Sequence, residues 1–107
     1  MPLISQEQIQ KMVDVIVDRS HPRAVYLFGS YARNAAGPDS DVDFLVVKDH
    51  SETSRSREMI NILKALELFR VPIDVVVADQ EHVNKNEATP GTIYFEIKNE
   101  RRLLYGS

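Results

Sequence analysis

Residues 27–33 read LFGSYAR, and residues 40–47 read SDVDFLVV. The first stretch completes a short apolar run that predicts a buried strand, and its Gly29-Ser30 pair ends that strand abruptly. A glycine lets the backbone turn sharply and lets a ligand approach closely. A serine that begins a helix lies beside free backbone N–H groups, which is a natural phosphate site. These residues therefore predict a cradle for the outer phosphates of a triphosphate.

The second stretch predicts a strand over residues 41–47 that begins with two aspartates. Alternation along a strand puts Asp41 and Asp43 on one face, together with Leu45 and Val47. Two adjacent carboxylates repel each other, and a bound divalent cation removes that conflict. Mg²⁺ prefers a few carboxylates together with phosphate oxygens and water. The pair is therefore predicted to bind a metal ion that bridges the protein and a nucleotide.

Asp74 is the acidic residue inside an otherwise apolar strand predicted over residues 73–77. A charge in such a strand is costly unless it has a partner. If this strand lies beside strand 41–47, Asp74 joins Asp41 and Asp43 as a third carboxylate. The alternative for Asp41 and Asp43 is a solvated strand end, and the alternative for Asp74 is an edge-strand charge that faces water. The alternative for Gly29 and Ser30 is a simple capped turn.

The remaining sequence predicts helices that cover these strands. Ser5 and Gln8 form a capping-box pattern, and Thr89-Pro90 is typical of a helix start with proline at its first position. The predicted elements are a helix over 5–19, strand 24–28, a short helix over 30–35, strand 41–47, a long helix over 51–69, strand 73–77, a loop or weak helix over 79–89, a short helix with Ile93, Tyr94 and Ile97 packed on the sheet, and strand 102–105. This order predicts an α/β (α+β) fold with a small mixed β-sheet covered by helices.

Length and composition limit the choices further. The 107 residues fit a single domain over residues 1–107. The net charge of −3 argues against a dedicated DNA-binding protein, which needs many cations. The chain has no cysteine, so disulfides and cysteine catalysis are excluded. We find no apolar run long enough for a membrane span and no signal-peptide pattern, and we therefore expect a cytoplasmic protein with no membrane association.

Together, the two quoted stretches resemble the signature of the DNA polymerase beta-like nucleotidyltransferase superfamily. The resemblance is greatest to its minimal stand-alone members, the MNT domains, and the element order extends it over the whole chain. It implies a polymerase beta palm-like fold in which Gly29 and Ser30 contact the nucleotide phosphates. It also implies that Asp41 and Asp43 carry two Mg²⁺ ions and that Asp74 helps to activate the attacking hydroxyl.

Two neighbouring residues qualify the match. For Arg33 there are two interpretations, a contact with a phosphate and a simply exposed side chain. Many family members have a glycine directly after this arginine, where the present chain has Asn34. Asparagine tolerates the left-handed backbone conformation better than most residues, so the departure is mild.

The resemblance implies an Mg²⁺-dependent transferase that moves AMP from ATP to a hydroxyl acceptor. We expect the acceptor site to come from a partner, because 107 residues leave no room for a second domain. Minimal family members commonly pair with small helical HEPN-type toxins, which implies an antitoxin that modifies a tyrosine of its partner. The alternatives are a binding module that has lost turnover and inhibits a helical partner by contact, and a transferase for a small molecule or RNA. A homo-oligomer could also build the acceptor site.

Overall fold

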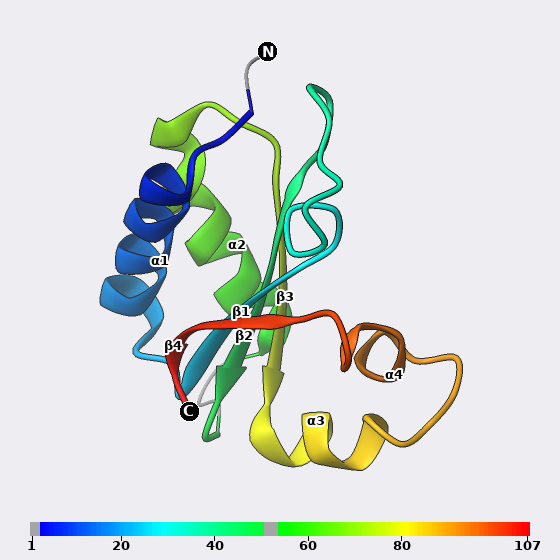
Figure 1. Ribbon diagram of the computed structural model, residues 1–107. Coiled ribbons are helices and arrows are strands. Elements are labelled where there is room, and N and C mark those ends of the chain that lie inside the picture. The colour runs from blue at the N-terminus through cyan, green and yellow to red at the C-terminus, as the bar shows by residue number, and fades with distance from the viewer. Residues whose placement is uncertain (1–2, 51–53) are drawn as a thin grey trace.

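The computed structural model describes residues 3–50 and 54–107, and in this part of the chain a four-stranded sheet is flanked by helices (Figure 1). The elements in chain order are α1 (Gln6–Ser20), β1 (Ala24–Phe28), β2 (Val42–Lys48), α2 (Arg55–Leu66), the 3₁₀ helix η1 (Glu67–Phe69), β3 (Ile73–Asp79), α3 (Gln80–Asn86), α4 (Ile93–Ile97) and β4 (Arg102–Gly106). All four predicted strands are present, with ends that differ from the prediction by at most two residues.

The sheet is mixed, as predicted, and its strand order is β3-β2-β1-β4. β1 pairs antiparallel with both β2 and β4. β2 and β3 run parallel, and parallel neighbours need a long crossover connection. α2 supplies that crossover, so the chain returns to the same end of the sheet before β3 begins.

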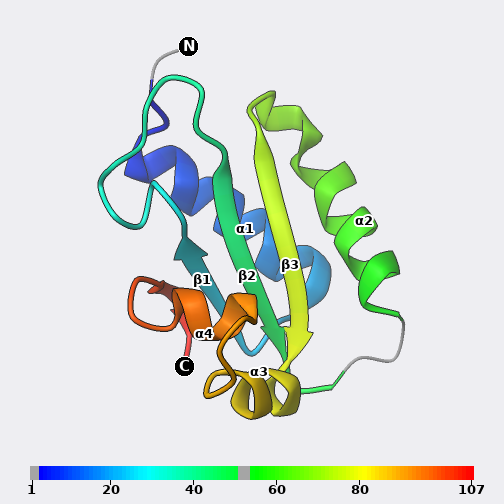
Figure 2. The same ribbon diagram turned by 90° about the vertical axis from the view of Figure 1, so that its right-hand side faces the viewer.

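Two layers of helices cover opposite faces of the sheet (Figure 2). α1 and α2 pack on one face, where Val42, Phe44 and Val46 join the larger core. α3 and α4 pack on the other face, where Leu45 and Val47 join a smaller core. The predicted alternation along β2 is therefore confirmed. α3 and α4 lie near the end where β2 and β3 finish, and they leave the start of these strands uncovered on that face (Figure 2).

α1 shows how the local sequence determines a helix. The Ser5 side chain accepts a hydrogen bond from the Gln8 backbone N–H and the Gln8 side chain bonds back to Ser5, which confirms the capping box. The helix ends at Ser20, and its C-cap His21 has a left-handed backbone and precedes Pro22. Its buried face consists of Ile9, Met12, Val13 and Ile16. In residues 3–50 and 54–107, no helix combines the length and the apolar character that membrane crossing requires.

The predicted short helix over residues 30–35 is wrong, because this segment forms successive turns. Arg33 N–H bonds to the Gly29 carbonyl at 3.2 Å and Ala35 N–H bonds to the Ser30 carbonyl at 2.8 Å. Asn34 lies between them with a φ of 56°, a left-handed conformation that breaks the helical path. The residues predicted to bind the phosphates therefore lie in a turn that has no helix N-terminus.

Two other helix starts differ from the prediction. Ser54 caps α2, so the helix begins at Arg55, and the predicted residues 51–53 lie outside the described part of the chain. α4 begins after Thr92 and not at Thr89-Pro90. The reason is that the Thr92 hydroxyl accepts from Phe95 N–H at 3.2 Å and also lies 2.9 Å from the Asn86 carbonyl oxygen.

The segment over 79–89 contains a helix, and α4 packs on the sheet through two of its three predicted residues. Residues Gln80–Asn86 form helix α3, capped by Asp79, so the helical alternative is correct. In α4, Tyr94 and Ile97 are buried against the sheet as predicted. Ile93 is instead 40% exposed, so its predicted packing is wrong.

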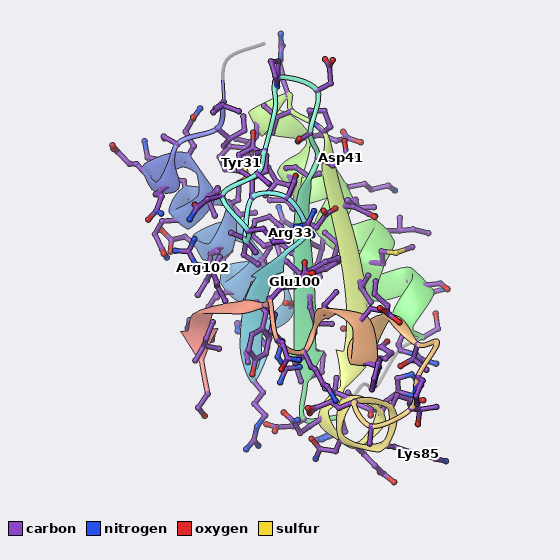
Figure 3. The ribbon with its side chains drawn as sticks, turned by 45° about the vertical axis from the view of Figure 1, so that its right-hand side comes forward. Tyr31, Arg33, Asp41, Lys85, Glu100 and Arg102 are labelled. Carbon is purple, nitrogen blue, oxygen red and sulfur yellow. The ribbon has the colours of Figure 1, made fainter. Side chains whose placement is uncertain are left out.

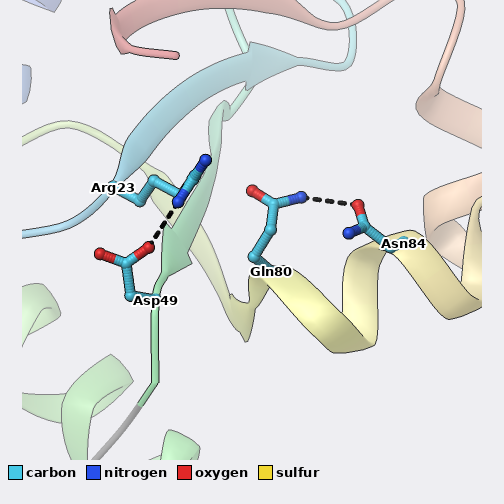
Figure 4. A network of polar contacts seen from close by, with 4 residues as sticks. All are labelled: Arg23, Asp49, Gln80 and Asn84. Atoms are coloured by element: carbon cyan, nitrogen blue, oxygen red, sulfur yellow. Dashed lines mark hydrogen bonds and ion pairs between the residues drawn. The ribbon is translucent and has the colours of Figure 1, made fainter.

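Figure 4 shows two polar contacts near the end of the sheet where β1 begins and β2 and β3 finish. Arg23, just before β1, donates to Asp49, just after β2, at 2.8 Å. Gln80 donates to Asn84 at 2.7 Å along the exposed side of α3. Both contacts lie away from the end where β1 finishes and β2 begins.

Candidate active site

Three aspartates lie at the end of the sheet where β2 and β3 begin. Asp43 and Asp74 are register partners on the two parallel strands, so their backbones are about 4.8 Å apart. Asp41 lies directly before β2, two residues before Asp43, and its charge acts on Asp43. Asp43 is partly buried, and Asp41 and Asp74 are exposed. The structure thus brings the three predicted carboxylates together, because the crossover through α2 places β3 beside β2.

The surroundings of Asp43 raise the pKa of its carboxyl from 3.8 to about 6. Burial is the largest cause, and the like charges of Asp74 and Asp41 act in the same direction. Arg33 acts in the opposite direction and lowers the pKa, while Glu100 raises it. The local environment therefore has an excess of negative charge, which a cation would relieve.

Gly29 turns the chain directly over Asp43. Its φ is 75°, a left-handed conformation that favours glycine. A Cβ at this position would overlap Oδ2 of Asp43 and lie 3.1 Å from Cγ. Phe28, the preceding residue, is the register partner of Asp43. The glycine therefore lets the turn approach the Asp43 carboxylate closely.

Ser30 and Arg33 occupy the turn that follows. Ser30 is partly buried beside Gly29. The Arg33 side chain is 51% exposed, and its Nη1 donates to Oε2 of Glu100 at 3.1 Å. In Figure 3, Arg33 and Glu100 extend toward each other from the turn and from the α4–β4 connection. Arg33 therefore lies at the site but contacts a carboxylate of the same chain.

Glu100 belongs to the site and was missed by the sequence analysis. Its Oε2 accepts a hydrogen bond from Gly29 N–H at 2.8 Å, in addition to the bond from Arg33. Glu100 stands in a polar segment between α4 and β4 that has no motif or spacing in common with the quoted stretches. It lies 71 residues from Gly29 along the chain, so only the folded structure reveals the contact.

The three aspartates have the donor chemistry for Mg²⁺, which prefers oxygen ligands. As they stand, no group of three or more His, Cys, Asp or Glu side chains within residues 3–50 and 54–107 is arranged to hold a metal ion. Oδ1 of Asp74 instead accepts from the backbone N–H of Val75 at 3.1 Å. The carboxylates would therefore have to turn toward a common ion to share it.

Comparison with known proteins gives consistent results. The family model described as a nucleotidyltransferase domain matches residues 9–104. A Methanocaldococcus jannaschii protein, provisionally named a protein adenylyltransferase, is 26% identical over 78 residues, which cover 72% of this chain and 78% of the relative.

Solved structures show the same fold. A crystal structure from Sulfolobus solfataricus, provisionally named a nucleotidyltransferase, has a TM-score of 0.61 at 19% identity and covers 92% of this chain and 77% of that one. A toxin–antitoxin structure with AMP-PNP has a TM-score of 0.55 at 17% identity, over 92% and 73%. The complex of a tri-AMPylated Shewanella oneidensis HEPN toxin with its MNT antitoxin has a TM-score of 0.52 at 18% identity, over 95% and 74%.

The family match confirms the resemblance that the two quoted stretches indicated. It runs from α1 into β4 and includes the turn, the three aspartates and Glu100. The chain therefore belongs to the nucleotidyltransferase domain family and is a nucleotidyltransferase.

Proposed function

We propose that this chain transfers AMP from ATP to a hydroxyl group on a partner protein, as the antitoxin of a HEPN/MNT-type pair. The observation that carries the proposal is the environment of Asp43, which is partly buried, next to Asp74 in register, and directly under Gly29. Excess negative charge beside a glycine turn suits a metal-bound triphosphate better than it suits a purely structural role. The reaction would take place in the cytoplasm, where ATP and Mg²⁺ are abundant.

Each side chain then has a defined task. Gly29 and Ser30 would bind the outer phosphates, and Arg33 would contribute a positive charge to them. Asp41, Asp43 and Asp74 would bind Mg²⁺, with two ions expected. Mg²⁺, when bound, supplies charge neutralisation for the carboxylates and the phosphates.

The bond changes are those of a single phosphoryl substitution. The acceptor hydroxyl oxygen forms a bond to the α-phosphorus of ATP. The bond from that phosphorus to the oxygen bridging to the β-phosphate breaks, and pyrophosphate leaves with the electron pair. The hydroxyl proton passes to the Asp74 carboxylate, which is exposed and so within reach of a bulky acceptor. Catalysis rests mainly on positioning and on charge stabilisation.

A protein acceptor is supported by the surroundings of the site and by the relatives. The face of the sheet that carries the aspartates is uncovered by helices at this end (Figure 2), which leaves room for a large partner. One relative is provisionally named a protein adenylyltransferase, and a structural neighbour pairs an MNT antitoxin with an AMPylated HEPN toxin. We therefore favour a small helical partner over a small molecule or RNA.

A binding module without turnover is the second candidate. It is favoured by the contact between Glu100 and Gly29 N–H, which engages a proposed phosphate donor, and by the carboxylates that are not gathered for a metal. Such a module would inhibit the partner simply by covering it, and its site carboxylates would be dispensable.

Intact-mass spectrometry of a HEPN-type partner separates the two candidates. The partner is incubated with ATP, Mg²⁺ and either the wild-type chain or the Asp41→Ala, Asp43→Ala double variant. We expect the wild type to add adenylate mass to a partner tyrosine and the double variant to add none. Asp39→Ala is the matched control, because Asp39 is an exposed aspartate in the same loop and should keep full activity. A partner that is inhibited equally by both chains and never gains mass would establish the binding module.

A further inference from the structure

Glu100 bonds to the groups that the proposed function assigns to the triphosphate. One carboxylate oxygen, Oε2, accepts from Gly29 N–H at 2.8 Å and from Arg33 Nη1 at 3.1 Å. A carboxylate oxygen and a phosphate oxygen are both anionic acceptors, and they compete for the same donors. The glycine N–H and the guanidinium therefore present an anion site that the chain fills with its own side chain.

The fold holds Glu100 in this position. Its backbone N–H bonds to the Ile97 carbonyl at 3.0 Å, directly after α4. The next residue, Arg101, lies with its guanidinium carbon 4.5 Å from the centre of the Tyr26 ring and 3.5 Å, through Nη2, from Oε2 of Glu87. These contacts attach the connection to β1 and to the end of α3. The Glu100 side chain is only 24% exposed, and its bond from Gly29 N–H is partly buried, whereas its bond from Arg33 is exposed to water.

The same placement is electrostatically unfavourable for a site that already holds three aspartates. Glu100 adds its negative charge to those of Asp74 and Asp41 around Asp43, and Arg33 alone opposes them among the groups that act on Asp43. A neutral acceptor could brace the turn through the glycine N–H, whereas the charged Glu100 also pairs with Arg33, the cation assigned to the phosphates. A side chain that occupies the phosphate site until the ligand displaces it would carry a negative charge, as Glu100 does.

We propose that Glu100 is an internal competitor for the phosphate site, which must leave Gly29 and Arg33 when the triphosphate of ATP binds. The proposal rests on the proposed function, because it assumes that these donors receive phosphate. Without nucleotide, the Glu100 carboxylate satisfies the donors of the turn. Only ligands with enough negative charge to displace this carboxylate can then bind.

Titration calorimetry with Mg²⁺-ATP and with Mg²⁺-tripolyphosphate tests this idea in the wild type and two variants. Glu100→Ala removes the competitor, and Glu100→Gln keeps a neutral acceptor of the same shape. We expect binding of both ligands to tighten about tenfold in Glu100→Ala, since one charge-assisted contact no longer competes, with Glu100→Gln between this variant and the wild type. Glu96→Gln is the matched control, because it removes one negative charge from an exposed position on α4 and should leave both affinities unchanged.

The outcomes separate the competitor from a brace and from failure of the proposed function. If the wild type binds ATP and a folded Glu100→Ala binds it equally or more weakly, Glu100 only braces the turn and the competitor idea is wrong, while the proposed function stands. If Glu100→Ala does not fold, Glu100→Gln decides in the same way, with tighter binding as the expected result. If no chain binds either ligand, both proposals are wrong.

Discussion

Replacing Gly29 by alanine should destabilise the fold and also disrupt the proposed metal–nucleotide site. The substitution carries two costs. The left-handed backbone costs an alanine about 1–2 kcal/mol, because its φ of 75° is unfavourable for a residue with a Cβ. The new Cβ also overlaps Oδ2 of Asp43, so that carboxylate must rotate away at a further cost of about 1 kcal/mol. The total is about 2–3 kcal/mol, and the rotation displaces a proposed metal ligand.

Gly91 and Gly37 supply matched controls. Gly91 has a φ of 92° with nothing within 4 Å of a new Cβ, so Gly91→Ala carries the backbone cost alone. Gly37 has the same open space without a left-handed φ, so Gly37→Ala should be close to neutral. At about 4 °C per kcal/mol for a domain of this size, we expect a loss of about 4–8 °C for Gly91→Ala and about 8–12 °C for Gly29→Ala.

The assay is thermal unfolding with and without Mg²⁺-ATP. A ligand at 100 times its dissociation constant adds about 2.7 kcal/mol to the stability of the folded chain. We expect this gain in the wild type, in Gly91→Ala and in Gly37→Ala, and its absence in Gly29→Ala. If Gly29→Ala unfolds no earlier than Gly91→Ala and keeps the full ligand gain, the close approach of Gly29 to Asp43 has no role in the site and the reasoning fails.

The remaining predictions concern charge and capping. The pKa of Asp43 is about 6 in the folded chain against 3.8 as its ordinary value, so folding favours the protonated form, and stability is lost as the pH rises through 6. In urea titrations, Asp43→Asn should therefore raise the free energy of unfolding by about 1 kcal/mol at pH 8 and leave it unchanged at pH 4. The value at pH 8 is reduced because the side chain is partly exposed. Thr92→Ala should cost about 1 kcal/mol, because the cap of α4 is lost, and Thr92→Ser should cost much less by the same titration. Lys48 pairs with Glu58 at 3.5 Å, and both side chains are only about 15% exposed, so Lys48→Met should lower the free energy of unfolding by about 2–3 kcal/mol in thermal unfolding. Asp49→Ala breaks an exposed pair and should lower it by less than about 1 kcal/mol.

Each of these has a result that would contradict it. An equal effect of Asp43→Asn at pH 4 and pH 8 would mean that the carboxyl is not destabilised by burial. Equal stability of the alanine and serine variants at position 92 would show that the hydroxyl does not support α4. A Lys48→Met variant as stable as Asp49→Ala would mean that burial adds nothing to the Lys48–Glu58 pair.

Many features of the fold can be predicted from residues that are close together in the sequence. The capping box at Ser5 and the alternation of Val42, Phe44 and Val46 depend on contacts within a few residues, and the structure confirms both. The spacing of Asp41 and Asp43 likewise places two carboxylates on one face without any tertiary information. Local steric and hydrogen-bonding preferences are sufficient for features of this kind.

Local signals failed where competing bonds decide the outcome. The segment after Gly29 was predicted as a helix, yet Asn34 is left-handed and the segment closes into turns. Thr89-Pro90 matched a helix start, yet Thr92 caps α4 because its hydroxyl reaches both Phe95 N–H and the Asn86 carbonyl. In both stretches a local bond or backbone conformation outweighed the propensity of the sequence pattern.

The sequence alone is sufficient to predict the strand faces, the glycine turn and the paired aspartates, because each depends on residues close together in the chain. The register of Asp74 with Asp43 and the bond between Glu100 and Gly29 depend on how distant segments pack. Strand pairing and a contact across 71 residues arise when the helices pack and bring distant segments together, and no local pattern encodes that choice.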